Sequence, residues 1–175
     1  MSLRDAIKDR LNEQRLFVLP PSLAGERVER TMLVNAEVYQ AVSGPWGSSE
    51  AYRMGRLRAD LDTFTEGKMI SIANDPLEKP KSAYMARTDP PRDEVWDIRS
   101  RDPRPGLRVL GCFGETDTFI ALAWSDRESL GAYGSREWAA FIRRGKAEWR
   151  KLFPTYPPHS GSKISDYVSK NFITV

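Results

Sequence analysis

The middle of the chain places two arginines in neighbouring segments that have the composition of β-strands. Arg99 ends the run Val95–Arg99, and Arg108 lies in the run Leu107–Phe113. The connection contains Pro-Arg-Pro-Gly and is too short for a parallel crossover, which predicts an antiparallel pair. Adjacent strands are ~5 Å apart, so two arginines on one face can converge on a single phosphate and bind it with charge-assisted hydrogen bonds.

Two more residues could join these arginines in phosphate chemistry. Arg127 follows a third strand-like run, Thr118–Trp124, and would add positive charge. Tyr133 could donate a proton or stack on a base. The strand arginines also have a structural alternative, in which their stems cover the sheet and their guanidinium groups pair with nearby carboxylates. The candidate partners are Glu94, Asp97 and Asp102.

A second basic set lies in a predicted helix that runs from Gly134-Ser135 to Leu152. The members that fall near one stripe, and that could bind RNA, are Arg136, Arg143, Lys146 and Arg150. The alternative is a solvated face opposite the apolar stripe of the same helix, as is usual for amphipathic helices. That apolar stripe consists of Trp138, Phe141, Ile142, Trp149 and Leu152, and we expect these aromatics to be buried.

Residue counts exclude several other chemistries within one chain. His159 is the only histidine, which excludes catalysis by a histidine pair and a site with several histidine ligands. Its proline-rich surroundings predict an exposed side chain. Cys112 is the only cysteine and lies in an apolar strand, so we expect a packed thiol. The chain has no glycine-rich phosphate loop, and we expect neither a metal nor a cofactor.

The elements that must position these residues follow from hydrophobic periodicity and turn signals. An amphipathic helix is predicted over Ser2–Arg15, and another begins at Ser48 or Ser49 and carries Met54, Leu57, Leu61 and Phe64 on one face. The segment Glu29–Val42 alternates as a strand does but has the composition of a helix, with a lean to the strand. Short strands are possible over Ala83–Arg87 and Asn171–Val175.

Three consecutive motifs carry a resemblance to a known family. They read Val95-Trp96-Asp97-Ile98-Arg99, then Leu107-Arg108-Val109-Leu110-Gly111-Cys112-Phe113, then Asp117-Thr118-Phe119-Ile120-Ala121-Leu122. In order and spacing they resemble the phage-derived RelE-like family of the RelE/HigB toxin superfamily, over roughly residues 48–153. The resemblance implies an α+β fold, with a small twisted antiparallel sheet packed with helices. That sheet would be a three-strand meander plus one or two further strands.

The resemblance also implies a function. Such toxins are typically endoribonucleases that cut messenger RNA without a metal, often on the ribosome, and are silenced by an antitoxin protein. Arg99, Arg108, Arg127 and Tyr133 would form the catalytic set. Where many members have a His-Gly-aromatic stretch and paired lysines, this chain reads Ala123-Trp124-Ser125-Asp126-Arg127-Glu128. A non-catalytic RNA- or protein-binding module on the same scaffold is therefore the alternative.

Length and charge set the remaining expectations. A chain of 175 residues predicts one domain. We divide it into an N-terminal extension (1–47), the RelE-like core (48–153) and a proline-rich tail (154–175). The formal charge of +3 is compatible with a polyanionic partner. No apolar run approaches the ~18 residues of a membrane span, and the N-terminus lacks a signal-peptide core, so we expect a cytoplasmic protein. The N-terminal helix could mediate a homodimer.

Overall fold

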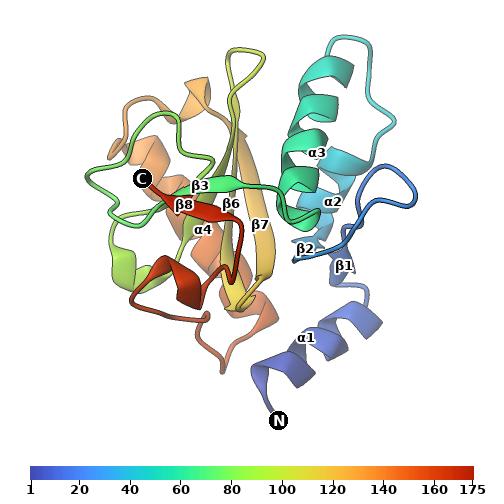
Figure 1. Cartoon of the computed structure of the whole chain (residues 1–175), viewed down its shortest axis with the longest axis vertical. Coiled ribbons are helices and arrows are strands. Elements are labelled where there is room, and N and C mark those ends of the chain that lie inside the picture. Colours follow the sequence, from blue (N-terminus) through green and yellow to red (C-terminus); the bar gives the residue numbers. More distant parts are fainter.

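The computed structural model describes all 175 residues and is built around one mixed β-sheet (Figure 1). The eight strands are β1 (Leu16–Val18), β2 (Thr31–Asn35), β3 (Ile70–Ala73), β4 (Met85–Arg87), β5 (Trp96–Ser100), β6 (Leu107–Glu115), β7 (Thr118–Asp126) and β8 (Phe172–Thr174). They are ordered β1-β2-β7-β6-β5-β4-β3-β8 across the sheet. The α+β class agrees with the prediction, but the sheet is larger than the four or five strands expected.

Helices cover both faces of this sheet (Figure 1). On one face lie α2 (Ala36–Ser43) and α3 (Ala51–Thr65), and on the other lie α1 (Leu3–Asn12) and α4 (Arg136–Leu152). Three short 3-10 turns complete the elements, and they are η1 (Pro91–Asp93), η2 (Glu128–Leu130) and η3 (Ile164–Asp166). None of the helices combines the length and the apolar character that crossing a bilayer requires.

The three predicted central strands are present and pair antiparallel in chain order. Strand β5 pairs with β6, and β6 pairs with β7. The register places Arg99 directly opposite Arg108, and Arg108 opposite Ser125. The two strand arginines are therefore cross-strand neighbours. Like charges in that position destabilise a sheet unless something compensates them.

Both ends of the chain contribute strands to the sheet, and the short strands predicted over Ala83–Arg87 and Asn171–Val175 are present as β4 and β8. Strand β2 pairs parallel with β7, and β8 pairs parallel with β3. The ambiguous segment Glu29–Val42 contains both a strand and a helix. The strand ends at Asn35 and the helix begins at the next residue. The Asn35 side chain accepts a hydrogen bond of 3.0 Å from the Val38 N–H and so caps α2.

The aromatic stripe of α4 is buried as predicted. Trp138, Phe141 and Trp149 are 3%, 5% and 4% exposed, and they pack against Leu110 and Leu122 of the sheet. Ser135 begins the helix by accepting a hydrogen bond from the Trp138 N–H at 3.2 Å. Helix α4 is therefore fixed over β6 and β7, with its N-terminal end beside the segment that follows β7.

Candidate active site

Strand alternation brings the charged residues of β5 and β6 to the sheet face that α4 covers. Trp96 and Ile98 point into the core beneath α3. Asp97 and Arg99 alternate with them and so point to the opposite face, where Arg108 joins them from β6. The sheet thus gathers two cations and one anion at a single place.

One carboxylate serves both strand arginines. The Arg99 Nε donates to Asp97 Oδ2 at 3.1 Å, and the Arg108 Nε lies 3.4 Å from the same oxygen. The side chains of Asp97, Arg99 and Arg108 are 1%, 7% and 12% exposed, so water screens them poorly. The second carboxylate oxygen, Oδ1, is buried and has no hydrogen-bond partner. Because two guanidinium groups share this one carboxylate, positive charge exceeds negative charge at this point of the sheet.

Lys79 adds a cation that sequence reasoning missed. It lies between β3 and β4, and its Nζ is 3.7 Å from the ring centroid of Tyr133. Burial lowers the pKa of Lys79 to about 8, and the charges of Arg99 and Arg108 act in the same direction. With this pKa, about a tenth of Lys79 is uncharged at pH 7 and half of it at about pH 8, which suits an amine that exchanges protons.

Tyr133 has a free hydroxyl proton. Its oxygen accepts a hydrogen bond of 2.8 Å from the Asp89 N–H, which leaves its own O–H free to donate. Burial raises the pKa of Tyr133, so the phenol is protonated at neutral pH. The ring packs edge-on against Trp138, with centroids 5.3 Å apart, and this contact ties Tyr133 to the start of α4.

Arg127 completes the group. Its guanidinium donates to the Gly131 carbonyl and lies 5.9 Å from the ring centroid of Trp138. Burial lowers the pKa of Arg108 to about 10, and the nearby charges of Arg99 and Arg127 contribute. We name the whole set the cationic cluster, which consists of Lys79, Arg99, Arg108 and Arg127 around Asp97 and Tyr133.

The basic residues predicted on the last helix lie apart from this cluster. Arg136, Arg143 and Arg150 are exposed on the side of α4 that faces away from the sheet. Lys146 is partly buried and pairs with Asp93 at 2.6 Å. The structure therefore brings the four predicted catalytic residues together at the cluster, while the four residues predicted to bind RNA lie elsewhere, on α4.

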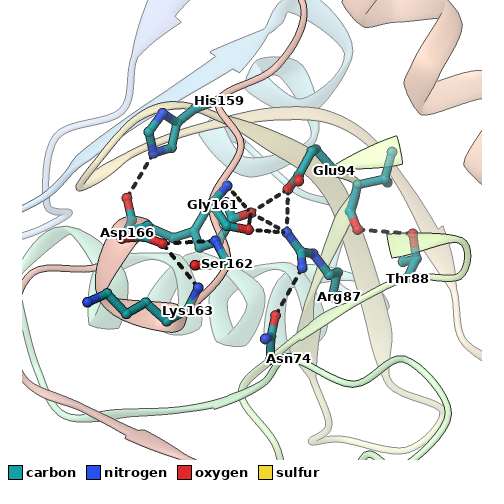
Figure 2. Close-up of polar contacts among 11 residues, drawn as sticks. Asn74, Arg87, Thr88, Glu94, His159, Gly161, Ser162, Lys163 and Asp166 are labelled. Carbon is teal, nitrogen blue, oxygen red and sulfur yellow. Dashed lines mark hydrogen bonds and ion pairs between the residues drawn. The ribbon is translucent and has the colours of Figure 1, made fainter. Parts of the chain in front are cut away.

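A second polar group, shown in Figure 2, lies on the opposite face of the sheet. The guanidinium of buried Arg87 donates to Glu94 at 2.7 Å and also to the Tyr167 hydroxyl. That hydroxyl accepts from the Gly161 N–H at 2.7 Å and lies 2.7 Å from the Glu94 carboxylate. His159 was expected to be exposed, but it is half-buried, with its ring edge-on to Tyr167 and its Nε2 2.8 Å from the Asp166 carbonyl.

These contacts join the C-terminal segment to the sheet. We therefore expect their loss to destabilise the protein. Tyr167→Phe removes a hydroxyl that contacts Arg87, Glu94 and Gly161, and it leaves the Gly161 N–H without its hydrogen-bond partner. We expect the free energy of unfolding to fall by about 1–3 kcal/mol, measured by urea denaturation. Tyr156→Phe is the matched control, because its hydroxyl reaches the Met1 carbonyl at an exposed site and should matter little. Equal stability of both variants would contradict this role.

Cys112 is buried, as expected, and burial raises the pKa of its thiol. No group of three or more histidine, cysteine, aspartate or glutamate side chains is arranged to hold a metal ion. Searches against family models, curated proteins and solved structures found no match to this chain.

Proposed function

We propose that the protein is a metal-independent endoribonuclease, of the RelE-like toxin kind, which cleaves messenger RNA at the cationic cluster. The observation that carries the proposal is the composition of this cluster. Four cations from four separate segments lie around a single buried carboxylate, and one of them, Lys79, has a perturbed pKa, as does the phenol of Tyr133. Such an excess of positive charge is suited to a phosphate with a developing negative charge.

The order of the elements supports the RelE-like part of the proposal. Helix α3 precedes the antiparallel strands β5, β6 and β7, and α4 follows them. This is the order that the resemblance over residues 48–153 implies. Strands β1, β2 and β8 enlarge the sheet beyond that region.

The chemistry can be assigned to individual side chains. Uncharged Lys79 takes the proton of a ribose 2′-hydroxyl, and the 2′-oxygen attacks the adjacent phosphorus. The bond from phosphorus to the 5′-oxygen then breaks, and Tyr133 gives its proton to the leaving oxygen. The products are a 2′,3′-cyclic phosphate and a 5′-hydroxyl. Arg108 and Arg127 stabilise the charge that accumulates on the phosphoryl oxygens.

Arg99 has a different role from the one that its position in the strand predicts. Its guanidinium already donates to Asp97 and, at 3.0 Å, to the Pro80 carbonyl. We therefore assign Arg99 as a positioning residue, which orients Asp97 and holds the segment that carries Lys79.

A non-catalytic RNA- or protein-binding module is the second candidate. The observation that favours it is the low exposure of the strand arginines, since both already share the Asp97 carboxylate. A single assay with labelled RNA distinguishes the two candidate functions. A binding module would retain a labelled RNA intact, whereas an endoribonuclease would release fragments with cyclic phosphate ends.

The proposed endoribonuclease activity also implies partners. They are messenger RNA or the ribosome, a cognate antitoxin protein and, in a homodimer, a second copy of the chain. Expression of the protein should arrest growth if it cleaves messenger RNA in the cell. Normal growth, together with intact RNA in the purified assay, would favour the binding module.

The phosphate-binding role of Arg108 predicts the behaviour of Arg108→Ala. We expect the RNA cleavage rate to fall on the order of 10²–10³-fold, as when one transition-state donor is removed. Stability should fall by only about 1–2 kcal/mol, because Asp97 keeps Arg99 as its partner and the loss of Arg108 relieves repulsion between the two arginines. Arg143→Ala is the control, since it removes the same charge from an exposed helix position. A clear loss of stability with unchanged cleavage would make Arg108 a structural residue.

A further inference from the structure

A cavity of about 430 Å³ opens on the α4 face of the sheet, away from the cationic cluster. It lies between η1, the C-terminal end of α4 and the proline-rich segment that follows this helix. The cluster adjoins Trp138 near the start of α4, whereas the cavity adjoins Trp149. These tryptophans are 11 residues apart by their numbering, or about 16 Å along a helix, so the cavity is a separate site.

The charges at the cavity are unbalanced. Arg92, Lys146 and Arg150 line it together with a single carboxylate, Asp93. That carboxylate is engaged by Lys146 at 2.6 Å. The guanidinium groups of Arg92 and Arg150 make no hydrogen bond or ion pair within the chain. Two free arginines at one cavity are suited to an anion, and guanidinium groups bind phosphate in a bidentate manner.

Most of the remaining lining residues are apolar or aromatic. Pro154, Tyr156 and Pro157 form one wall, and the largely buried ring of Trp149 lies beneath it. The Trp149 Nε1–H donates to the Tyr156 carbonyl at 2.8 Å, which ties this wall to α4. Proline and tyrosine rings offer a surface on which a base can lie. The cavity volume is within the range of sites for small ligands.

We infer that this cavity binds a nucleoside monophosphate unit. The phosphate would contact Arg92 and Arg150, and the base would lie against Tyr156 and the neighbouring prolines. The unit could be a free nucleotide or one residue of a longer RNA strand. The free-nucleotide case requires no catalysis at the cationic cluster, whereas the strand case rests on the proposed function.

The probe for this site is adenosine 5′-monophosphate, added to the full-length protein and followed by calorimetry or NMR. We expect saturable binding, which adenosine without its phosphate should show about tenfold more weakly. The double variant Arg92→Ala/Arg150→Ala should lose at least about tenfold in affinity for the monophosphate. The matched control is Arg143→Ala on the same helix outside the cavity, and it should bind as the wild type does. No binding of the monophosphate, or equal binding by the double variant, would overturn the inference.

A second arm separates the two sources of the ligand. The monophosphate is compared with a single-stranded RNA of about twelve nucleotides. This length is within the site sizes of proteins that bind single strands. If the double variant loses affinity for both, the cavity holds part of a strand. If it loses only the monophosphate, the ligand is a free nucleotide. Lys79→Met should bind the monophosphate normally, so failure of the cleavage proposal would leave this result interpretable.

Discussion

Replacement of Asp97 by asparagine should lower the free energy of unfolding by about 3–5 kcal/mol, the usual cost of removing one partner from a buried ion pair. Asp97 is the only carboxylate that contacts Arg99 and Arg108, and all three side chains are nearly inaccessible to water. Asparagine preserves the side-chain volume, so the loss reports charge and not a cavity. Urea denaturation of the variant and the wild type measures the effect.

The same variant tests whether the cluster accepts an anion. Inorganic phosphate bound among the cations would replace the missing carboxylate, so it should stabilise Asp97→Asn more than the wild type. The comparison requires chloride at matched ionic strength, because salt alone screens repulsion. Glu115→Gln is the control, since its partner Arg4 is largely exposed and phosphate should not affect it specifically. An Asp97→Asn protein as stable as the wild type would show that the arginines need no counter-charge.

The strand part of the site could be predicted from sequence because strand geometry is local. Alternation assigns Asp97 and Arg99 to one face, and the short Pro-Gly connection brings Arg108 beside them. Arg127 could be named because it follows the third strand directly, and Tyr133 because it lies between that strand and the predicted helix. Their convergence on the same point depends on α4, which was also predicted from its apolar stripe.

Lys79 could not be predicted in the same way. It lies in an irregular segment between β3 and β4 with no hydrophobic period to place it. Its position depends on long-range contacts, chiefly the hydrogen bond from Arg99 to the Pro80 carbonyl and the packing of its amine on Tyr133. Its lowered pKa is a consequence of that burial, so no local pattern could have indicated it.

The extent of the sheet was missed for a related reason. Strand β2 pairs in parallel with β7 across more than eighty residues of sequence, and β8 pairs with β3 across about a hundred. Local propensity identifies a strand but does not select its partner over such separations. The buried contacts of Arg87 with Glu94 and Tyr167 fasten the C-terminal segment, and they join residues that no short motif connects.

The proposed role of Lys79 as the base predicts the largest effect on activity. We expect Lys79→Met, which keeps an unbranched stem over Tyr133, to reduce the RNA cleavage rate on the order of 10²–10⁴-fold. Lys79→Arg should be nearly as defective, because it retains a cation but cannot give up its proton at neutral pH. Lys81→Met is the control at an exposed position two residues away. Cleavage by Lys79→Arg at the wild-type rate would show that only the charge matters.

The pH dependence follows from the pKa of Lys79, which burial lowers from 10.5 to about 8. Because the uncharged amine is the base, the wild-type cleavage rate should rise with pH and level off above about 8. The free energy of unfolding should also rise with pH. Between about pH 8 and 10.5 the unfolded chain binds the Lys79 proton and the folded protein does not, so folding becomes more favourable as the pH rises. Lys79→Met should lose this rise in stability, and since unfolding needs no RNA, the burial of Lys79 is tested separately from its part in catalysis.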